Sequence, residues 1–533
     1  MNLDQHQPVL IVGAGPTGMV LANELLRRRV PCRMIDKRSG PTETSRSFTL
    51  HARTMEMFEH MGLAHRFLRD GLKSRGFLFN FKGKDVQPAL DFTGLDSDYP
   101  YILIYNQNET EQRLREHLDA TYAFHPEWGV ELTAFTEAGD NYRATLRNRA
   151  GEEQLIHPRW IAGCDGIHSF VRENAGLEFS GENYEGMVMQ MMDVDYTGFD
   201  GADDWIHYYM SKDSFLLLTK LSSGRHRVLI SDMGEADDPN LTRRQAFQSI
   251  IDGHISGTEL AEPEWATKWE LWRRITSSYS KAGIFLAGDA AHVHSPSGGQ
   301  GMNVSMQDAF NLGWKLAMVQ HGYARSKLLD TYTSERKPVG TQVIAGTHAM
   351  HDIIMAHGHG MDDRLQLTRR EGWHSDTVNL ISGLSYTYRD VIDITAGLKS
   401  LPGPACGDRV GNVEFSGNRQ LYDLTRTGRL NLFIVEKSGA TDAEAVTLQR
   451  RISEQYAHVV HSVILSERRL EGMHSANMVA DGKGQFAERY GELNGGQLLL
   501  IRPDSYIAFR SHFDEAERLF EYLNIWFMPL RRL

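Results

Sequence analysis

The chain has 533 residues, of which 41% are hydrophobic, 24% charged and 10% aromatic. This composition is typical of a folded globular protein, and the length exceeds the roughly 100–200 residues of one domain. The net charge is -12 and no long basic run occurs, so we expect no nucleic-acid partner.

Membrane spans and cysteine motifs are both missing from the sequence. Its apolar runs stay short of the ~18 residues of a membrane span, and its first residues lack a basic targeting region. We therefore expect a cytoplasmic protein without membrane contact. Cys32, Cys164 and Cys406 are far apart and form no Cys-x-x-Cys pair, which argues against a disulfide framework, a dithiol centre or a zinc site. We predict no metal.

The first elements in chain order follow a βαβ pattern. An apolar strand over 9–12 precedes a glycine-rich turn, a helix over 16–29 and a second strand over 32–35. The turn glycines permit a tight bend, close approach to a pyrophosphate and helix–strand packing, while the helix N-terminus favours phosphate. The motif alone does not separate FAD from NAD, and an incidental glycine-rich turn is the alternative. The predicted nucleotide-binding residues are Gly13, Gly15, Pro16, Thr17, Gly18, Asp36 and Lys37.

The middle and end of the chain predict further domains. Strand-like runs at 205–210, 215–221 and 226–231 indicate a sheet-rich region, and glycine-punctuated strand and helix signals return over 283–315. The nucleotide-binding domain is therefore expected to be discontinuous, with the sheet domain inserted. After a Pro- and Gly-rich linker at 401–411, short strands at 430–435 and 497–501 surround a helix over 443–456, which indicates a third, smaller α/β domain.

Two more motifs accompany the first. One is Gly163-Cys164-Asp165-Gly166 with Ser169 and Arg172, and the other runs from Gly288-Asp289 to Gly298-Gly299-Gln300-Gly301-Met302-Asn303. In order and spacing, the three motifs resemble those of the class A FAD-dependent aromatic hydroxylases, the phenol hydroxylase and 4-hydroxybenzoate hydroxylase type of flavoprotein monooxygenase. The resemblance covers about 9–338, and the last part of the chain looks like the thioredoxin-like domain of larger members.

The resemblance implies an α/β Rossmann-like FAD-binding fold with an inserted β-sheet substrate domain and a C-terminal thioredoxin-like α/β domain. We place the first part of the FAD-binding domain at 1–183 and the sheet-rich substrate-binding domain at 184–275. The second part of the FAD-binding domain, with a helical connection, is expected at 276–400, and the thioredoxin-like domain at 401–533. That last domain lacks a Cys-x-x-Cys pair, so we expect it to have a structural or dimer-supporting role. In the second case the protein would be a homodimer.

The resemblance also implies roles around FAD. Asp289, at the end of an apolar strand, suits the ribityl hydroxyls, and the loop that follows opens a helix whose N–H groups would face the flavin. Asp165 would serve both FAD and the nicotinamide, with Arg172 as its companion, although a salt bridge or helix cap is the alternative for both. Arg46 and Gln107 match family positions that contact the flavin or its phosphates, and ordinary surface residues are the alternative for both. The FAD-binding residues predicted from these motifs are Arg46, Gln107, Asp165, Arg172, Asp289, Gly298, Gly299, Gly301, Met302 and Asn303.

The implied reaction is hydroxylation of a small, phenol-like aromatic substrate with NADH or NADPH and O₂, through a flavin hydroperoxide. Pro296 would lie over the reacting face of the flavin, unless it is a plain loop proline. Phe48 stands where some phenol hydroxylases carry an acidic or histidine base, so the base is not identified. His207 and Tyr209 alternate onto one face of a predicted strand and are candidates to line the pocket, with ordinary packing as the alternative.

Other functions share this fold. The segment 269–275 does not match the Trp-x-Trp-x-Ile-Pro signature of the family's halogenases, which argues against halogenation. Epoxidation or Baeyer–Villiger oxygenation of a polyketide-like substrate stays open. A flavin-binding protein without turnover is the alternative from another class.

Overall fold

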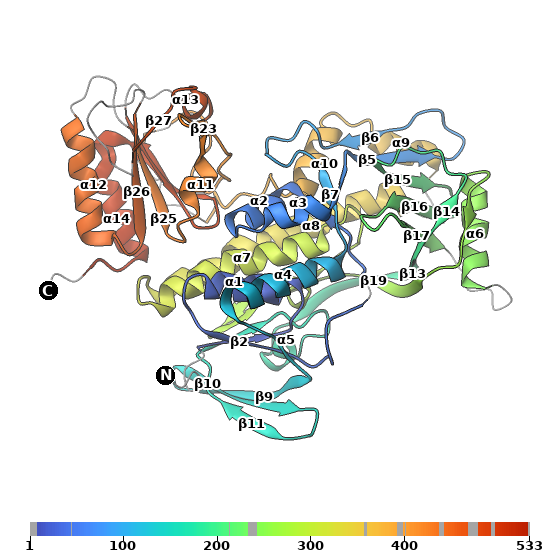
Figure 1. Ribbon diagram of the computed structural model, residues 1–533, viewed down its shortest axis with the longest axis horizontal. Coiled ribbons are helices and arrows are strands. Elements are labelled where there is room, and N and C mark those ends of the chain that lie inside the picture. Colours follow the sequence, from blue (N-terminus) through green and yellow to red (C-terminus); the bar gives the residue numbers. More distant parts are fainter. Residues whose placement is uncertain are drawn as a thin grey trace.

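The computed structural model describes residues 8–43, 45–212, 214–232, 242–355, 360–391, 398–399, 401–435, 442–466, 478–491 and 496–530. Figure 1 shows a central body of helices over a sheet, a second sheet at one side and the C-terminal domain at the other. The predicted domain limits at 1, 400 and 533 lie outside the described residues. Among the described helices, none is long and apolar enough to cross a membrane.

A six-stranded sheet forms the base of the central body. Five of its strands run parallel and only β20 is antiparallel. The central strands are continuous buried apolar runs, because a parallel sheet is covered on both faces. In spatial order the strands are β20 (Ser280–Lys281), β21 (Ile284–Leu286), β12 (Trp160–Gly163), β1 (Val9–Val12), β2 (Cys32–Asp36) and β8 (Glu127–Trp128).

Helices α1 (Pro16–Leu26), α4 (Gln107–Tyr122) and α7 (Gly301–Gln320) lie together over this sheet (Figure 1). Gly313 lets α7 approach α1 closely, since a Cβ at this position would lie 2.4 Å from Cβ of Glu24. Below the sheet in the same view is a three-stranded extension. It consists of β9 (Val130–Ala138), β10 (Asn141–Asn148) and β11 (Glu153–Ile156).

The second sheet has eight strands and takes segments from three parts of the chain. It extends beyond the predicted 184–275, because β5 pairs in parallel with β15 and β22 pairs with β19. A parallel pairing needs a long crossover, so the sequence of either strand does not reveal its partner. The spatial order is β22 (His292–Val293), β19 (Trp265–Thr276), β13 (Phe179–Val194), β17 (His226–Asp232), β16 (Ser214–Lys220), β15 (Trp205–Met210), β5 (Gly76–Phe81) and β6 (Ala89–Asp91).

Smaller elements connect the two sheets. The long helix α8 (Thr331–Met355) contacts β15, β16 and β19 of the eight-stranded sheet, and α6 (Arg243–His254) packs on that sheet's outer face. The remaining elements of this part are β3 (Thr49–Leu50), β4 (Leu72–Ser74), β7 (Ile102–Ile104), β14 (Tyr196–Thr197), β18 (Glu259–Leu260), α2 (Ala52–His60), α3 (Ala64–Asp70), α5 (Phe170–Asn174), α9 (Met361–Leu367) and α10 (Trp373–Ser382).

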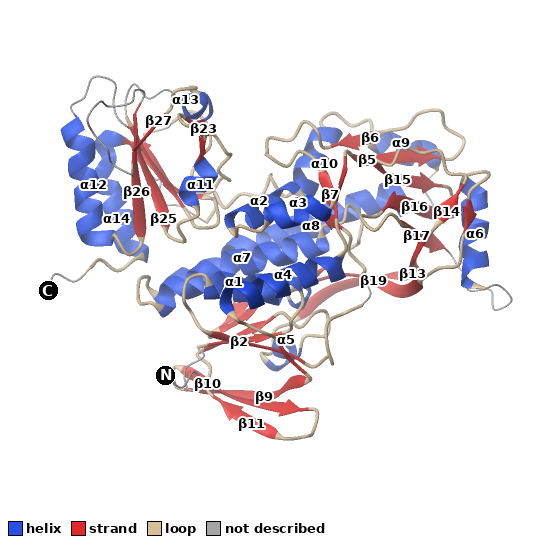
Figure 2. Ribbon diagram, viewed as in Figure 1, coloured by secondary structure: helices blue, strands red, loops and turns tan. Residues whose placement is uncertain are grey.

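The C-terminal domain contains a five-stranded mixed sheet with helices on both faces (Figure 2). The parallel pairing of β25 with β26 and the antiparallel pairing of β25 with β28 give the mixed α/β arrangement expected of a thioredoxin-like domain. Its elements are β23 (Glu414–Phe415), β24 (Arg419–Gln420), α11 (Leu421–Thr425), β25 (Leu430–Val435), α12 (Asp442–Tyr456), β26 (Val460–Ser466), β27 (Met478–Ala480), α13 (Gln485–Tyr490), β28 (Gln497–Ile501), β29 (Ile507–His512) and α14 (Ala516–Trp526).

A buried ionic network joins this domain to α7 and α8. Arg502 makes a bidentate pair with Glu335, both distances 2.7 Å, and also contacts Asp504. Lys315 donates to Glu335 at 2.8 Å, and Asn311 bridges Glu335 and Asp504. Burial alone would raise the pKa of Glu335, but Arg502 and Lys315 more than offset it and hold the pKa below its usual value. The network fixes the C-terminal domain to the helix that begins at the predicted flavin loop.

We predict that Glu335→Gln lowers the thermal unfolding temperature, because it leaves Lys315 and part of Arg502 buried without a counter-charge. Breaking a buried pair in this way costs about 3–5 kcal/mol. The depressed pKa of Glu335 means that its contribution is present above the unfolded value of about 4.3 and is lost as the pH falls through the folded value. The difference between variant and wild type should therefore shrink on acidification. Glu517→Gln, at an exposed pair with Arg451, is the control; equal effects of the two changes would contradict this role.

Candidate active site

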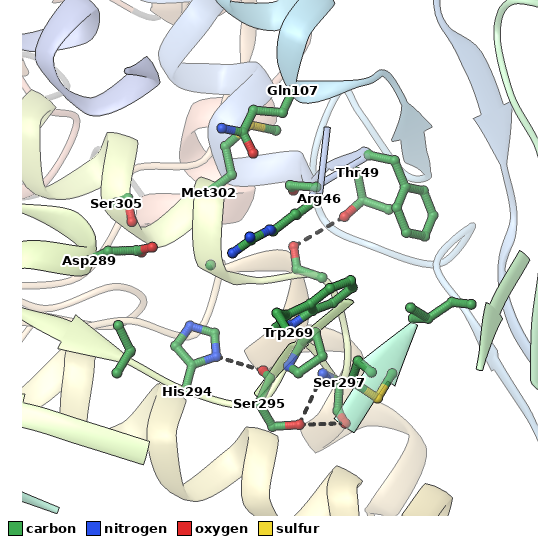
Figure 3. A pocket seen from close by; sticks show the side chains of 18 of the residues that line it. Arg46, Thr49, Gln107, Trp269, Asp289, His294, Ser295, Ser297, Met302 and Ser305 are labelled. Atoms are coloured by element: carbon green, nitrogen blue, oxygen red, sulfur yellow. Dashed lines mark hydrogen bonds between the residues drawn. The ribbon is translucent and has the colours of Figure 1, made fainter. Parts of the chain in front are cut away.

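The three sequence motifs meet at one edge of the six-stranded sheet. Each directly follows a parallel strand, β1, β12 or β21, so their carboxyl ends lie side by side. Next to this edge lies a cavity of about 510 Å³, shown in Figure 3, whose walls come from both sheets. The neighbouring carboxyl ends explain why three motifs that begin at Gly13, Gly163 and Gly288 meet at one site.

The first motif gives the cavity a helix N-terminus. Gly13 has φ +106°, and a Cβ there would lie 2.2 Å from the carbonyl oxygen of Cys164. A Cβ on Gly18 would lie 2.0 Å from the carbonyl oxygen of Gly13, so both positions require glycine. Gly15 has no neighbouring atom within 4 Å of such a Cβ and lines the cavity with Pro16 and Thr17. The start of α1 therefore faces open space.

Asp36 holds this turn from behind. Its carboxylate accepts hydrogen bonds from the backbone N–H of Ala14, at 2.9 Å, and from the guanidinium of Arg38. Burial raises the pKa of Asp36, and these bonds offset the rise and bring it below its usual value. Lys37, which the sequence predicted to bind the cofactor, is exposed and does not line the cavity, whereas Arg38 does. Alternating side chains beyond the strand end explain the difference.

Asp165 and Arg172, both predicted to bind FAD, make hydrogen bonds within the protein. Asp165 accepts from the Ser169 hydroxyl at 2.5 Å and from the N–H of Val171 at 3.2 Å, which caps α5. Burial raises the pKa of this carboxyl, opposed by those bonds. Arg172 donates to the carbonyl oxygens of Ala290 and Ile167 and so ties the second motif to the third. Neither side chain lines the cavity, whereas Cys164 and Gly166 do.

The third motif places a carboxylate and a glycine loop on the cavity. Asp289 is open to the cavity although protein surrounds it on the other sides. Burial raises its pKa, and this rise is opposed by the charge of His292, by the nearby Ser305 hydroxyl and by the charge of Arg46. Gly298 and Gly299 have φ of +85° and +65°, conformations that favour glycine. Pro296, Gly299, Gly301 and Met302 line the cavity.

Two buried side chains behind this loop fix its shape. Asn303 donates to the carbonyl oxygens of Thr49 and Gly299 and accepts from the N–H of His51. The His51 ring contacts the carbonyl oxygens of Gly298 and Gly299, and burial lowers its pKa to about 4. Asn303 therefore positions the loop and does not itself line the cavity.

Arg46 and Gln107 both line the cavity, as the sequence predicts. The Arg46 guanidinium lies 5.6 Å from the ring centre of Trp269, and Gln107 donates to Glu111 at 3.1 Å. Figure 3 shows Arg46 between Asp289 and Trp269. Sequence reasoning did not assign a role to several lining residues: Arg38, Thr42, Ser47, Thr49, Tyr208, Trp269, His294, Ser295, Ser297 and Ser305. His294, Ser295 and Ser297 lie within the third motif, whereas no motif marks the others.

His207 and Tyr209, the sequence candidates to line the pocket, do not line this cavity. His207 points to the outer face of β15 and contacts the carbonyl oxygen of Ala202 at 2.9 Å, and Tyr209 lies beside His254 of α6. Since successive side chains in a strand point to opposite faces, the residue between them, Tyr208, faces the cavity. The strand itself is placed correctly; which face is inward depends on the packing of α6.

The cavity is divided by polarity. Arg38, Arg46 and Asp289 stand at the end next to the first motif, where α1 begins. The other end is apolar, and its lining residues are Phe48, Phe77, Met189, Tyr208, Phe215, Leu217, Leu229 and Met355. In the described chain, the buried Nε2 atom of His294 has no hydrogen-bond partner, and its ring lines the cavity.

These features fit the FAD expected from the sequence. The open space at the start of α1 suits a pyrophosphate, and the Asp289 carboxylate and the Nε2 atom of His294 offer acceptors to hydroxyl or N–H groups. Among the described residues, no cluster of three or more His, Cys, Asp and Glu side chains could hold a metal ion.

Comparisons with known proteins give the same assignment. The FAD binding domain family model matches residues 6–347, and the aromatic-ring hydroxylase C-terminal model matches 403–529. The chain is 47% identical to a pentachlorophenol 4-monooxygenase of Sphingobium chlorophenolicum over 97% of this chain and 96% of the relative. It is 32% identical to a 6-methylpretetramide 4-monooxygenase of Streptomyces rimosus over 94% and 90%.

Among solved structures, the OxyS anhydrotetracycline hydroxylase from Streptomyces rimosus superposes with a TM-score of 0.76. It is 26% identical and covers 97% of this chain and 98% of its own. The family models, the long alignments and the cavity thus agree on cofactor and reaction. The chain belongs to the aromatic-ring hydroxylase family of FAD-dependent flavoprotein monooxygenases, which use NAD(P)H and O₂.

Proposed function

We propose that this monooxygenase hydroxylates a small phenol that carries no carboxylate, with halogenated phenols as the first candidates. The observation that carries the proposal is the composition of the apolar end of the cavity. Its walls are aromatic, aliphatic and methionine side chains, and the cations that line the cavity stand at the opposite end. A carboxylate at the apolar end would lose its hydration without gaining a counter-charge, which is costly. A neutral or weakly acidic ring suits this environment.

Size and the relatives support a single ring. The cavity of about 510 Å³ must hold the reacting part of FAD as well as the substrate, and sites for one drug-sized ligand are already roughly 300–1,000 Å³. The 47% identical relative is named for pentachlorophenol. The 32% identical relative is named for a polyketide-type compound, so polycyclic phenols belong in the test as the competing class.

Tyr208 is the group proposed to orient the phenol. It is the one hydroxyl-bearing side chain among the residues given above for the apolar end, and its hydroxyl lies near the backbone of Gly298 in the flavin loop. Burial raises the pKa of this hydroxyl, so it stays protonated and can donate to a substrate oxygen. The orienting hydroxyl is therefore proposed to lie beside the flavin loop.

The FAD contacts are proposed from the cavity walls. Gly15, Pro16 and Thr17 would hold the pyrophosphate, Arg38 the adenosine half, and Asp289 the ribityl chain, with Arg46 and Gln107 beside it. The loop from Pro296 to Met302 would hold the ring system, and Asn303 would act through that loop. FAD, when bound, supplies the chemistry that passes electrons from the reduced nicotinamide to O₂ and an oxygen atom to the ring.

The remaining assignments concern the domains and the cell. We assign substrate binding to the eight-stranded sheet and a structural role to the C-terminal domain. A cytoplasmic location agrees with three free cysteines and with the need for reduced nicotinamide. A homodimer stays a prediction of the sequence.

Phenols without a carboxylate should stimulate NAD(P)H oxidation more strongly than the matching hydroxybenzoates. Oxidation is followed with H₂O₂ measured in parallel, and the product should gain one oxygen atom by mass. Little peroxide is expected with a true substrate, because a filled, dry cavity suppresses the unproductive release of peroxide. Stimulation by polycyclic phenols alone would transfer the assignment to that class, and a hydroxybenzoate as the best substrate would contradict the proposal.

Tyr208→Phe should lower kcat/KM for a phenol roughly tenfold or more, since removing one buried hydrogen bond to substrate costs about 1–3 kcal/mol. Tyr209→Phe is a matched control on the opposite face of the same strand and should leave kcat/KM within about twofold. Both are measured with FAD content verified. Equal effects of the two changes would exclude Tyr208 as the orienting group.

Gly15→Ala should weaken FAD binding at least about tenfold without unfolding the protein. Its Cβ meets no protein atom within 4 Å but occupies space proposed for the pyrophosphate, and tenfold corresponds to about 1.4 kcal/mol. FAD affinity is measured by fluorescence titration of the apoprotein, and folding by circular dichroism. Gly40→Ala, which also meets no atom within 4 Å, is the control. An unchanged FAD affinity in Gly15→Ala would contradict the proposed pyrophosphate position.

A further inference from the structure

Two serine hydroxyls flank Pro296 in the flavin loop and connect the cavity to helix α8. Ser295 and Ser297 both line the cavity, and their Oγ atoms lie 2.9 Å apart, within hydrogen-bond distance. Figure 3 shows this contact at the cavity wall. The Oγ atom of Ser295 also lies 3.4 Å from Nδ1 of His351. A row of groups that can both donate and accept therefore leads away from the cavity.

His351 lies on the side of α8 that faces the cavity, one turn before the lining residue Met355. Only 4% of its surface is exposed, and its ring packs on Tyr184 of β13 at 4.2 Å between centres. One turn earlier, His348 bonds the Tyr184 hydroxyl at 3.3 Å and is 40% exposed. The buried imidazole is thus separated from solvent by about one turn of helix.

We propose that Ser297, Ser295 and His351 form a proton relay that removes the phenolic proton of the substrate, an inference that rests on the proposed phenolic function. The phenol O–H bond breaks and its proton passes to Oγ of Ser297. The Ser297 hydroxyl proton passes to Oγ of Ser295, and the Ser295 proton passes to Nδ1 of His351. The net products are a phenolate in the cavity and an imidazolium at His351, with both serines again neutral. His351 acts through the serines and is a positioning residue.

The other candidate bases near the loop are less suited to this task. His51 and His294 each contact backbone carbonyl oxygens, and burial lowers the pKa of both to about 4. Their rings therefore stay neutral and are poor proton acceptors near neutral pH. Asp289 stands at the opposite, nucleotide end of the cavity. Removing the proton makes the ring more electron-rich and so favours oxygen transfer.

The surroundings of His351 can accept the added charge. Its own helix presents His348 and Asp352, whose Nδ1 and Oδ1 atoms are 4.0 Å apart. Strand β13 presents Tyr184 and Glu182, and β19 presents Arg273, which pairs with Glu182 and lies over Tyr184 at 6.0 Å. Among the described groups just named there are two carboxylates and one guanidinium, and the carboxylate side chains are 46% exposed at Asp352 and 72% exposed at Glu182. The proton can therefore leave to solvent on this side.

The test uses the oxidised, FAD-bound enzyme and 4-nitrophenol, whose phenolate absorbs visible light. Stopped-flow mixing below the pH at which the free phenol ionises reports phenolate formation on binding, without turnover. In the wild type the rate should rise with pH through one ionisation, because His351 must be neutral to accept the proton. His351→Asn keeps an acceptor for the Ser295 hydroxyl but cannot take a proton near neutral pH. It should slow phenolate formation at least about tenfold and abolish that pH step, with the Kd of 4-nitrophenol within about twofold.

Ser295→Ala interrupts the path while keeping the histidine, and it should give the same loss; combining it with His351→Asn should add nothing further. His157→Asn, an exposed histidine outside the cavity, is the control for the histidine change. Wild-type rate and pH dependence in His351→Asn would overturn the relay and leave phenol hydroxylation standing. Failure of the wild type to bind any phenol would instead overturn the proposed function, and the relay with it.

Discussion

The parallel pairing of β1, β12 and β21 is the constraint on which the site depends. Parallel strands place their carboxyl ends at a common edge, so each loop that follows them enters the same space. The glycines of the first loop are required by the protein's own backbone at Gly13 and Gly18, whereas Gly15 leaves room for a ligand. The same glycine motif therefore lets the backbone pack closely at this edge of the sheet and leaves space there for a ligand.

The second consequence of this edge is that α7 begins at the flavin loop and extends away from it, with its whole length buried. Its far half carries Asn311 and Lys315, which enter the buried ionic network with Glu335 and Arg502. Desolvating so many charges is favourable only when each finds partners of fixed geometry. The network therefore specifies one position for the C-terminal domain and, through α7, holds the loop end of the helix in place without supplying any redox group.

Much of this arrangement is predictable from the sequence, because the informative signals are local. The strand at 205–210 and the helix at 443–456 follow from periodicity, and the FAD motifs follow from glycine spacing. Features that depend on how distant segments pack together could not be predicted from the sequence. The inward face of β15 is set by α6 on its other side, so Tyr208 replaces His207 and Tyr209 at the cavity. The parallel partner β5 comes from more than 100 residues away, and no local pattern marks it.

The apolar walls of the cavity have two opposing effects on the proposed reaction. Excluding water protects the oxygen-transfer chemistry, yet an apolar wall also opposes formation of the phenolate that makes the ring reactive. Bulk water could accept the phenolic proton only if it entered the cavity, which would end the exclusion of water. The proton therefore has to leave through protein groups that connect the cavity to the outside. The serines on either side of Pro296 lie in a loop that lines the cavity, and behind them helix α8 carries His351. The loop proposed to position the flavin is therefore also the place where the phenolic proton can leave a water-free cavity.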